Sequence, residues 1–220
     1  MSEPLQTLYA NRFSVFESVR NDVWKVLTRY FFQKWVRPTD VVLDLGAGYC
    51  EFINNINAGK KYALDLNPAT PSKAQSDVTV ISRDVLTPWP LPSGSVDVVF
   101  TSNCFEHLPR KEGLQYCLSE ISRVLRPGGI LIALGPNIRY CYHVYWDFFD
   151  HHLPLSDRSM SEAIQGVGLE VRQSIPRFLP YTMSGKKPPA ANLIRAYLAL
   201  PLVWPLFGKQ FLLVAQNRDA

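Results

Sequence analysis

The sequence shows neither a signal-peptide pattern nor a membrane-spanning run. Residues 1–11 contain no basic segment followed by an apolar run, which a signal peptide requires. Nowhere do about 18 uncharged apolar residues follow one another, as a membrane-spanning helix needs. We therefore expect a cytoplasmic protein without a membrane span.

Cysteine and histidine are few, with four residues of each. Cys50, Cys104, Cys117 and Cys141 form no Cys-x-x-Cys pair, and no histidine stands beside them at a zinc-ligand spacing. We therefore expect reduced thiols, as in an intracellular chain, and no metal site.

The basic character of the chain is weak and scattered. The net charge is +4, and Lys186-Lys187 is a short basic cluster. A solvated surface accounts for this pattern, and neither a basic stripe nor an Asn-Pro-Pro-Tyr-like base-flipping motif is present. We expect no nucleic-acid partner, whereas an acidic substrate or an anionic membrane surface stays open.

What is present suits one domain with alternating strands and helices. The chain has 220 residues, 47% of them hydrophobic, which is enough for one sizeable core. Short runs rich in Val, Ile and Leu are typical of a parallel sheet that is covered on both faces. Such runs predict five buried strands, at residues 41–45, 62–66, 78–81, 96–101 and 130–134.

Helical spacing of apolar residues separates or precedes these runs. It predicts an amphipathic helix with one break over residues 12–35, ended by Pro38, and a second helix over 113–125. Strands that alternate with helices imply right-handed crossovers and an open, doubly wound α/β sheet.

The last third of the chain has a different composition. A helix is predicted at 161–166, a strand at 169–174 and a final strand at 211–215. Residues 176–209 contain six prolines. A long insertion before a final strand is usually functional or mobile.

A glycine turn follows the first strand of the predicted sheet. Val41–Leu45 leads into Gly46-Ala47-Gly48, after which we expect a helix to begin. Glycines allow a tight turn and a close approach of a ligand to the backbone, and amides at a helix N-terminus favour an anionic group. A lone Gly-x-Gly is also common in ordinary turns that bind no ligand.

Carboxylates stand at or near the ends of the next strands. Asp65 lies about 20 residues after the glycines, where an acid can accept both ribose hydroxyls. Asp84 closes the third strand and would face the crevice at the sheet's carboxyl edge. Each could instead cap a turn, such as Asn67-Pro68, and Asp97 is expected only to terminate a turn.

These motifs together resemble the class I S-adenosylmethionine-dependent methyltransferases. The resemblance covers roughly residues 39–137. It rests on five sequence motifs that occur in the family's order. They lie at 43–48, at 64–68, at 83–85, at 97–99 together with 105–108, and at 125–129. It implies a Rossmann-like seven-stranded sheet, mostly parallel with one antiparallel strand near the C-terminus. It also implies S-adenosylmethionine as cofactor.

The resemblance also divides the chain into parts. We expect a single methyltransferase domain over residues 1–220. It would have an N-terminal helical cap at 1–38, a cofactor-binding core at 39–137, and an acceptor-side loop, an insertion and the last strands at 138–220.

The resemblance assigns cofactor contacts by position. The loop with Asp44, Gly46, Ala47 and Gly48 would hold the methionine part. Asp65 would hold the ribose, with Leu66 against the adenine and Asp84 and Val85 at the adenine edge. Asn103 and Cys104 would lie near the amino-acid portion and the methyl group. Cys50 stands where many members have a third glycine, which leaves the loop geometry there uncertain.

Three histidines are candidates for a catalytic base: His107, His151 and His152. His107 follows the fourth strand, and His151 and His152 lie in a loop after the fifth strand. Alternatively, His107 would only shape the pocket, and the other two would donate hydrogen bonds to substrate or cap a helix. His143 is a fourth, less favoured candidate.

The acceptor is expected to be a small molecule, sugar-linked or lipid-linked. Six aromatic side chains at 140–149 either pack within the protein or line the binding site of such a substrate. The apolar run Leu193–Phe207 is expected first as a packed lid, and otherwise as a dimer face or a peripheral membrane contact through Trp204 and Phe207. The sequence indicates no oligomeric state.

Two other functions are considered. The chain could bind S-adenosylmethionine without catalysis, since members of such families can have altered acceptor sites. An NAD-dependent oxidoreductase is disfavoured, because Gly46-x-Gly48-x-x-Glu51 lacks the third small residue that allows close helix–strand packing.

Overall fold

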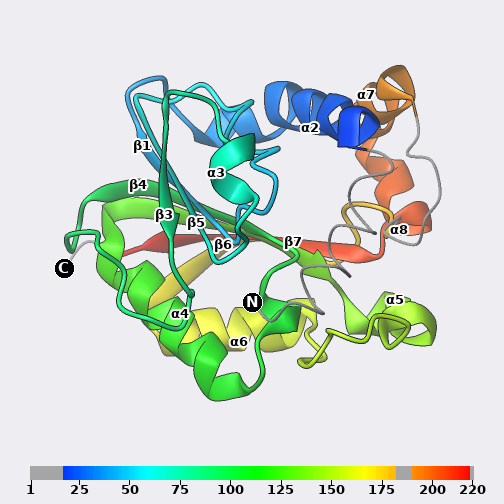
Figure 1. Ribbon diagram of the computed structural model, residues 1–220. Helices are drawn as coiled ribbons and strands as arrows, with labels where there is room; N and C mark the ends of the chain where they lie inside the picture. Colours follow the sequence, from blue (N-terminus) through cyan, green and yellow to red (C-terminus); the bar gives the residue numbers. More distant parts are fainter. Residues whose placement is uncertain (1–16, 182–189, 219–220) are drawn as a thin grey trace.

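A seven-stranded sheet forms the centre of the computed structural model, which describes residues 17–181 and 190–218 (Figure 1). The strand order is β3-β2-β1-β4-β5-β7-β6. The strands are β1 (Val41–Leu45), β2 (Lys60–Asp65), β3 (Val78–Ser82), β4 (Val96–Ser102), β5 (Leu125–Pro136), β6 (Leu169–Ile175) and β7 (Gln210–Asn217). All seven strands predicted from the apolar runs are therefore present, with ends that differ by up to five residues.

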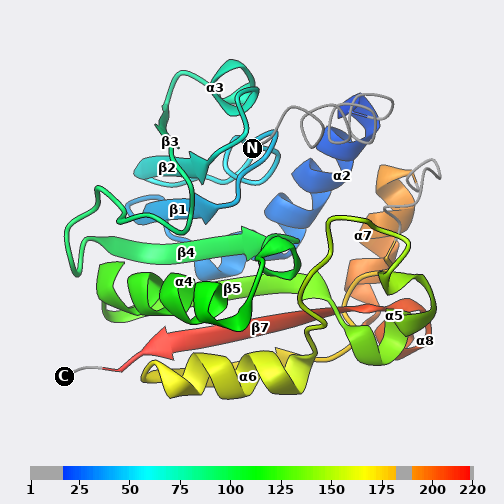
Figure 2. The ribbon, with the colours of Figure 1, turned by 60° about the horizontal axis from the view of Figure 1, so that its bottom comes forward.

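β7 is the antiparallel strand of this sheet. It runs antiparallel to both of its neighbours, β5 and β6, whereas the other neighbouring pairs are parallel. Figure 2 shows the arrowheads of β1, β2 and β4 at one end of the sheet and that of β7 at the other. The predicted Rossmann-like sheet, mostly parallel with one antiparallel strand, is confirmed.

Helices lie against both faces of the sheet (Figures 1 and 2). The α-helices are α2 (Glu17–Tyr30), α3 (Thr70–Lys73), α4 (Lys111–Val124), α5 (Ile138–Tyr145), α6 (Asp157–Gly166), α7 (Ala191–Ala199) and α8 (Trp204–Phe207). Short 3-10 helices occupy Phe32–Trp35, Phe105–His107 and Pro201–Val203. Among the described residues, no helix combines the length and apolar character that crossing a bilayer requires.

Side chains that point alternately to the two faces of the sheet form two hydrophobic cores, one on each face. In β5, Leu131 and Ala133 face a cluster with α4 and α6, while Ile132 and Leu134 face a cluster with α2 and α7. Successive side chains of a strand point to opposite faces, so a continuous apolar run supplies both clusters. The sheet is thereby held rigid between two layers.

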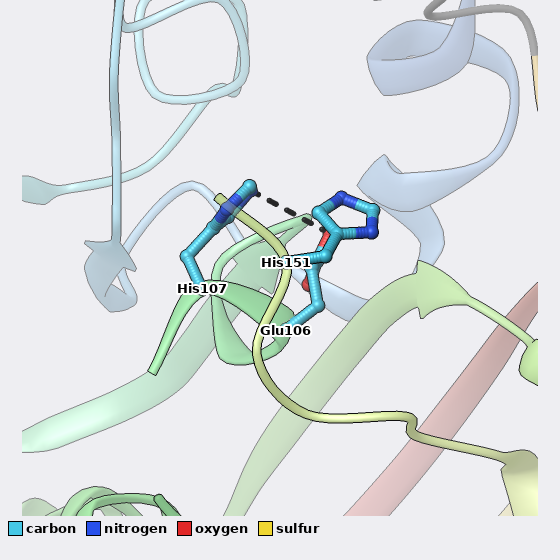
Figure 3. A group of neighbouring side chains, drawn as sticks. All are labelled: Glu106, His107 and His151. Carbon is cyan, nitrogen blue, oxygen red and sulfur yellow. Dashed lines mark ion pairs between the residues drawn. The ribbon is translucent and has the colours of Figure 1, made fainter. Parts of the chain in front are cut away.

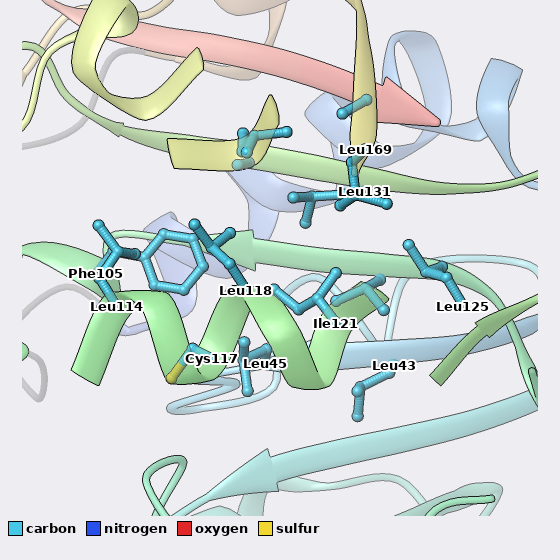
Figure 4. Packing of buried hydrophobic residues seen from close by; sticks show 14 of the residues in the cluster. Leu43, Leu45, Phe105, Leu114, Cys117, Leu118, Ile121, Leu125, Leu131 and Leu169 are labelled. Carbon is cyan, nitrogen blue, oxygen red and sulfur yellow. The ribbon is translucent and has the colours of Figure 1, made fainter. Parts of the chain in front are cut away.

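α4 shows how the sequence determines one of these layers. Leu114, Cys117, Leu118 and Ile121 recur at helical spacing and are buried. They pack over Leu43 and Leu45 of β1 and neighbouring strands (Figure 4). The helix predicted at 113–125 is confirmed as α4.

The segment after the glycine turn is not the expected helix. Residues 51–56 form turns, with only separate helix-like hydrogen bonds such as Asn54 N to Cys50 O at 3.0 Å. Cys50 has a φ of +62°. A residue in the left-handed region cannot continue a right-handed helix, so no regular helix runs through Cys50 from the glycine turn.

Three other regions differ from the sequence expectation or extend beyond it. The predicted loop after β5 contains α5, whose N-cap Asn137 accepts a hydrogen bond from Arg139 N. The helix predicted over 12–35 is α2 followed by a 3-10 helix, and its residues 12–16 lie outside the described residues. Residues 190–207 of the insertion contain α7 and α8, whereas Lys186-Lys187 lies outside the described residues.

Candidate functional site

A cavity of about 440 Å³ lies at the carboxyl ends of the parallel strands. It is lined by all ten residues that the sequence analysis assigned to the cofactor: Asp44, Gly46, Ala47, Gly48, Asp65, Leu66, Asp84, Val85, Asn103 and Cys104. Two of the three candidate bases, His107 and His152, also line it. The structure thus brings together residues that are up to 108 positions apart in the sequence.

The glycine turn is shaped by close contacts and positive φ angles. Gly46 has a φ of +71°, and a Cβ there would lie 2.6 Å from Cys104 Sγ. Gly48 has a φ of +52°, but a Cβ there would meet nothing within 4 Å. Gly46 is therefore required by its surroundings, whereas Gly48 keeps backbone open beside the cavity.

Asp65 is oriented by two backbone amides. Its Oδ2 accepts a hydrogen bond from Gly48 N and its Oδ1 from Asn67 N, both at 2.7 Å. Each carboxylate oxygen retains a second lone pair, so Asp65 both caps the turn and can accept further hydrogen bonds. Its pKa is raised, first because the carboxyl group is buried.

A second carboxylate, Asp44, lies deeper in the same cavity. It is buried at the wall, and its pKa is raised well above the ordinary 3.8 by burial and by the charges of Asp65 and Glu51. Burial and the two neighbouring negative charges both favour the protonated form of Asp44. A positively charged ligand in this cavity would favour its ionised form.

At the mouth of the cavity, β2 and β3 end in residues of different character. Leu66 exposes 41% of its surface although it is a large apolar residue. Asp84 is half-buried, and its Oδ1 accepts a hydrogen bond from Leu86 N at 2.9 Å. An apolar surface beside backbone and carboxylate polar groups is suited to a planar heterocycle. Asp97, in contrast, accepts from Val41 N and pairs with Arg126, outside the cavity lining.

Asn103 provides an acceptor at the end of β4. Its φ is +49°, and its Nδ2 donates to Ser102 Oγ at 3.1 Å. Its Oδ1 is buried without a hydrogen-bond partner among the described residues. A buried acceptor of this kind requires a donor, which an ammonium group of a ligand would supply.

The thiol of Cys104 also faces the cavity. Burial raises its pKa well above 9.0, and burial raises the pKa of Cys50, Cys117 and Cys141 to about 12 each. All four thiols are therefore protonated at neutral pH and are poor nucleophiles.

His107 is held between the carboxyl groups of Glu106 and Asp150. Figure 3 shows its contact with Glu106. Its Nδ1 lies 2.9 Å from Asp150 O and 3.3 Å from Asp150 Oδ2, and its Nε2 lies 3.9 Å from Glu106 Oε1. Glu106 is buried, and burial raises its pKa. Both neighbours can stabilise a positively charged imidazole.

His151 and His152 are placed differently from each other. His152 is exposed at the cavity, and its amide donates to Glu106 O at 2.8 Å. His151 is buried outside the cavity lining, with its ring 4.6 Å from that of Tyr145 and 5.0 Å from that of Phe148. His143 also lies outside the lining, 3.3 Å from Lys209 Nζ.

The same cluster offers ligand atoms for a metal ion. Glu106, His107 and His151 each place one such atom within 4.8 Å of the others. Imidazole and carboxylate groups at these separations could approach a divalent cation with modest side-chain movement. This arrangement was not apparent from the sequence, because His151 reaches Glu106 only through the fold of the loop after α5.

Several further lining residues were not predicted. Arg20 and Trp24 reach the cavity from α2, and Arg20 pairs with Glu51. α2 therefore covers the cavity as well as packing on the core. Asp150, next to two predicted histidines, also lines the cavity. Asp150 could have been predicted because it directly precedes His151 and His152. The contribution of α2 could not, because no local pattern reveals which face of this helix meets a distant loop.

Comparison with known sequences supports the resemblance. A family model described as a methyltransferase domain matches residues 43–133. A protein of Mycolicibacterium smegmatis, described as a probable S-adenosylmethionine-dependent methyltransferase, is 32% identical over 140 residues, which cover 60% of this chain and 52% of that protein. The chain spans about half the length of the curated relatives that it matches, between 41% and 52%.

Solved structures share the fold at lower identity. One is a methyltransferase from a complex with the Haloferax volcanii Trm112 methyltransferase activator; the match covers all of both chains, with a TM-score of 0.72 and 18% identity. Another is a SAM-dependent methyltransferase from Archaeoglobus fulgidus, with a TM-score of 0.67, 18% identity, and 96% of this chain and 98% of that chain covered.

Proposed function

We propose that the chain is a class I S-adenosylmethionine-dependent methyltransferase that transfers a methyl group from S-adenosylmethionine to a small-molecule acceptor, because residues 43–133 match a family model described as a methyltransferase domain. The observation that carries the proposal is that all ten residues assigned to the cofactor line one cavity. These residues come from four strand ends at the carboxyl edge of the sheet, where open α/β sheets bind ligands.

The residues of the cavity fit the cofactor's chemical groups. Asp65 has lone pairs available for ribose hydroxyls, and Leu66 offers an apolar surface for adenine. Asn103 Oδ1 can accept from the ammonium group. Asp44 adds negative charge that favours a cationic ligand.

The protein's contribution to transfer is to bind and orient the two reactants. A sulfonium is an activated methyl donor, so no covalent protein nucleophile is needed, and the neutral Cys104 thiol is consistent with this. Alignment of the acceptor with the methyl group can contribute roughly 7–11 kcal/mol at best. The cavity walls from α2 and from the loop with His152 would exclude water around the reacting atoms.

His107 is our candidate for the base that accepts a proton from the acceptor. If its Nδ1 donates to Asp150 O, its Nε2 is the basic nitrogen, and Glu106 lies 3.9 Å away to stabilise the charged ring. His152 is the second candidate because it also lines the cavity. Buried His151 is instead assigned to positioning of this cluster.

Aromatic side chains near the cavity support a sugar-linked or lipid-linked acceptor. Trp146 and Phe149, in the loop that carries Asp150 and His152, are exposed. Neither ring lines the cavity, but both belong to a loop whose Asp150 and His152 do, and exposed rings of this kind can stack on a sugar or contact a hydrocarbon chain.

Calorimetry tests the cofactor assignment. We expect S-adenosylmethionine and S-adenosylhomocysteine to bind and NAD not to bind comparably. Loss of a charge-assisted hydrogen bond should make Asp65→Ala bind at least about tenfold more weakly. Asp77→Ala is the matched control, because Asp77 pairs with Lys61 outside the cavity. Equal affinity of Asp65→Ala and the unmodified chain would disprove the ribose assignment.

The alternatives make different predictions in the same experiments. An NAD-dependent oxidoreductase would bind NAD more tightly than S-adenosylhomocysteine. A noncatalytic S-adenosylmethionine-binding protein would bind the cofactor but methylate no compound in a screen of candidate acceptors. Methylation of any acceptor that is lost in His107→Ala, with cofactor affinity retained, would support the proposed base.

A further inference from the structure

Large apolar side chains are exposed where α7 leads into α8. Leu200, Leu202, Leu206 and Phe207, here called the α7–α8 tip, are all exposed, Leu202 by 91% and Phe207 by 60%. Isolated exposed apolar residues are common, but four large ones within eight residues of the chain require an explanation.

The opposite side of this segment is firmly packed. Ile194, Leu198 and Trp204 are buried in the cluster below α2, and Trp204 Nε1 donates to Tyr197 O at 2.9 Å. None of residues 191–207 lines the cavity. The segment is therefore packed, as expected from the sequence, but it is not a lid over the site. Trp204, expected as a membrane contact, belongs to the core.

Part of the backbone of the tip is hydrogen-bonded or has no N–H group. Pro201 and Pro205 have no N–H group to desolvate. The amides of Val203, Trp204 and Gly208 donate within the segment, and the carbonyls of Leu206 and Gly208 accept from Arg177. These bonds lower the cost of transferring this part of the tip's backbone out of water.

The charge of this part of the chain has one sign. No Asp or Glu occurs between Glu170 and Asp219. Around the tip, Arg195 is exposed over the ring of Tyr30 at 4.7 Å, and Lys209 directly precedes β7. An apolar tip with cationic neighbours is complementary to an anionic lipid surface, and less so to an apolar protein groove.

The tip lies at the same edge of the sheet as the cavity. Gln210, which begins β7, pairs with Pro136, which ends β5, and Lys209 O accepts from Asn137 N at 2.9 Å. Figure 2 shows α5, α7 and α8 together at the end where the parallel strands terminate. A surface that contacts the tip would therefore lie near the mouth of the cavity.

We propose that the α7–α8 tip docks on the surface of a bilayer that contains anionic lipids. Leu202, Leu206 and Phe207 enter the interface between headgroups and acyl chains, and Arg195 and Lys209 pair with lipid phosphates. The contact is peripheral. It does not depend on the proposed methyl transfer, so either can fail while the other holds.

Vesicle flotation tests this proposal with the full chain. We expect the protein to float with vesicles of phosphatidylcholine and phosphatidylglycerol, and to bind much less to phosphatidylcholine alone or at high salt. The double variant Leu202→Asn/Phe207→Asn should lower the partition coefficient by more than about tenfold, because two exposed apolar side chains no longer transfer.

Matched variants separate the effect of charge on vesicle binding from any effect of the substitutions on folding. Arg195→Gln should weaken binding several-fold, whereas Arg172→Gln, which removes the same charge from a residue paired with Glu170, should not. All variants should retain the unfolding temperature and S-adenosylhomocysteine affinity of the unmodified chain.

Three results would overturn the proposal: no flotation of the unmodified chain with anionic vesicles, equal flotation of the double variant, or equal binding to neutral vesicles. If light scattering shows a dimer that the double variant loses, in the absence of flotation, the tip contacts a second copy instead.

Discussion

Gly46 and Gly48 share a positive φ but differ in what a methyl group would meet. At Gly46 it would overlap the Cys104 side chain, and at Gly48 it would meet open space. We expect Gly46→Ala to lower the free energy of unfolding by about 2–4 kcal/mol, from backbone strain and overlap together. Gly48→Ala should lower it by about 1–2 kcal/mol, from strain alone.

Chemical denaturation of both variants checks this difference. The second variant also tests the cavity, since its methyl group lies beside the proposed cofactor and should weaken S-adenosylhomocysteine binding. Equal destabilisation by the two substitutions would show that the contact with Cys104 relaxes without cost.

The raised pKa of Asp44 predicts a pH dependence of cofactor affinity. A bound sulfonium favours the ionised carboxylate, so the affinity is highest above the raised pKa and falls as the pH drops through it towards 3.8. The slope cannot exceed about tenfold per pH unit for each proton taken up. Calorimetry across this range measures it.

Two comparisons isolate the charge effect. S-adenosylhomocysteine carries no charge on sulfur, so its affinity should change less with pH than that of S-adenosylmethionine. Asp44→Asn should reduce the slope for the sulfonium ligand. Parallel pH profiles for the two ligands would contradict the assignment of Asp44 to a site near the sulfur.

At the level of elements, the aromatic cluster between α2, α7 and the strands is a main source of stability. Phe178 is fully buried, with its ring 4.4 Å from that of Phe31 and 5.1 Å from that of Trp204. Phe178→Ala should cost about 3–5 kcal/mol of unfolding free energy. Phe149→Ala is the matched control, because Phe149 is 88% exposed and should change stability by less than about 0.5 kcal/mol. Denaturant titration of both variants decides whether α7 is an integral layer or a loosely attached one.

Most elements of the sheet could be predicted because local pattern and burial agree. Strands such as Val41–Leu45 are short, apolar except for Asp44, and buried on both faces, and α4 carries a clear helical period. The helix expected after Gly48 could not be excluded, because the sequence does not reveal the positive φ of Cys50. α5 was missed because it is short and kinked at Cys141, where a φ of −127° and a ψ of 15° interrupt the helix.

The candidate site was predictable where it depends on strand ends. Asp44, Asp65, Asp84 and Asn103 occur at or near the carboxyl edge because each lies in or directly after a predicted strand. The contributions of Arg20 and Glu106 depend on how a distant helix and a buried loop pack. Such long-range contacts leave no signal in local sequence spacing.

At the scale of the whole molecule, ligand binding should stabilise the entire sheet. The cavity joins β1, β2, β4 and α2, so a ligand that binds only the folded chain shifts global unfolding. At about 100 times its Kd, S-adenosylhomocysteine should add about 2.7 kcal/mol, and so raise the Tm by about 5–11 °C. Scanning calorimetry should show no comparable rise with NAD. A stabilisation by NAD equal to that by S-adenosylhomocysteine would contradict the proposed cofactor.

The reversed direction of β7 has a practical consequence. Because this strand starts at the rim and runs away from it, Asn217 lies at the edge of the sheet remote from the cavity (Figure 2). A biotin tag or fluorescent reporter attached beyond β7 would leave the rim facing solution. Immobilised in this orientation on a sensor chip, the protein would present both its ligand site and its α7–α8 tip to injected nucleosides or vesicles.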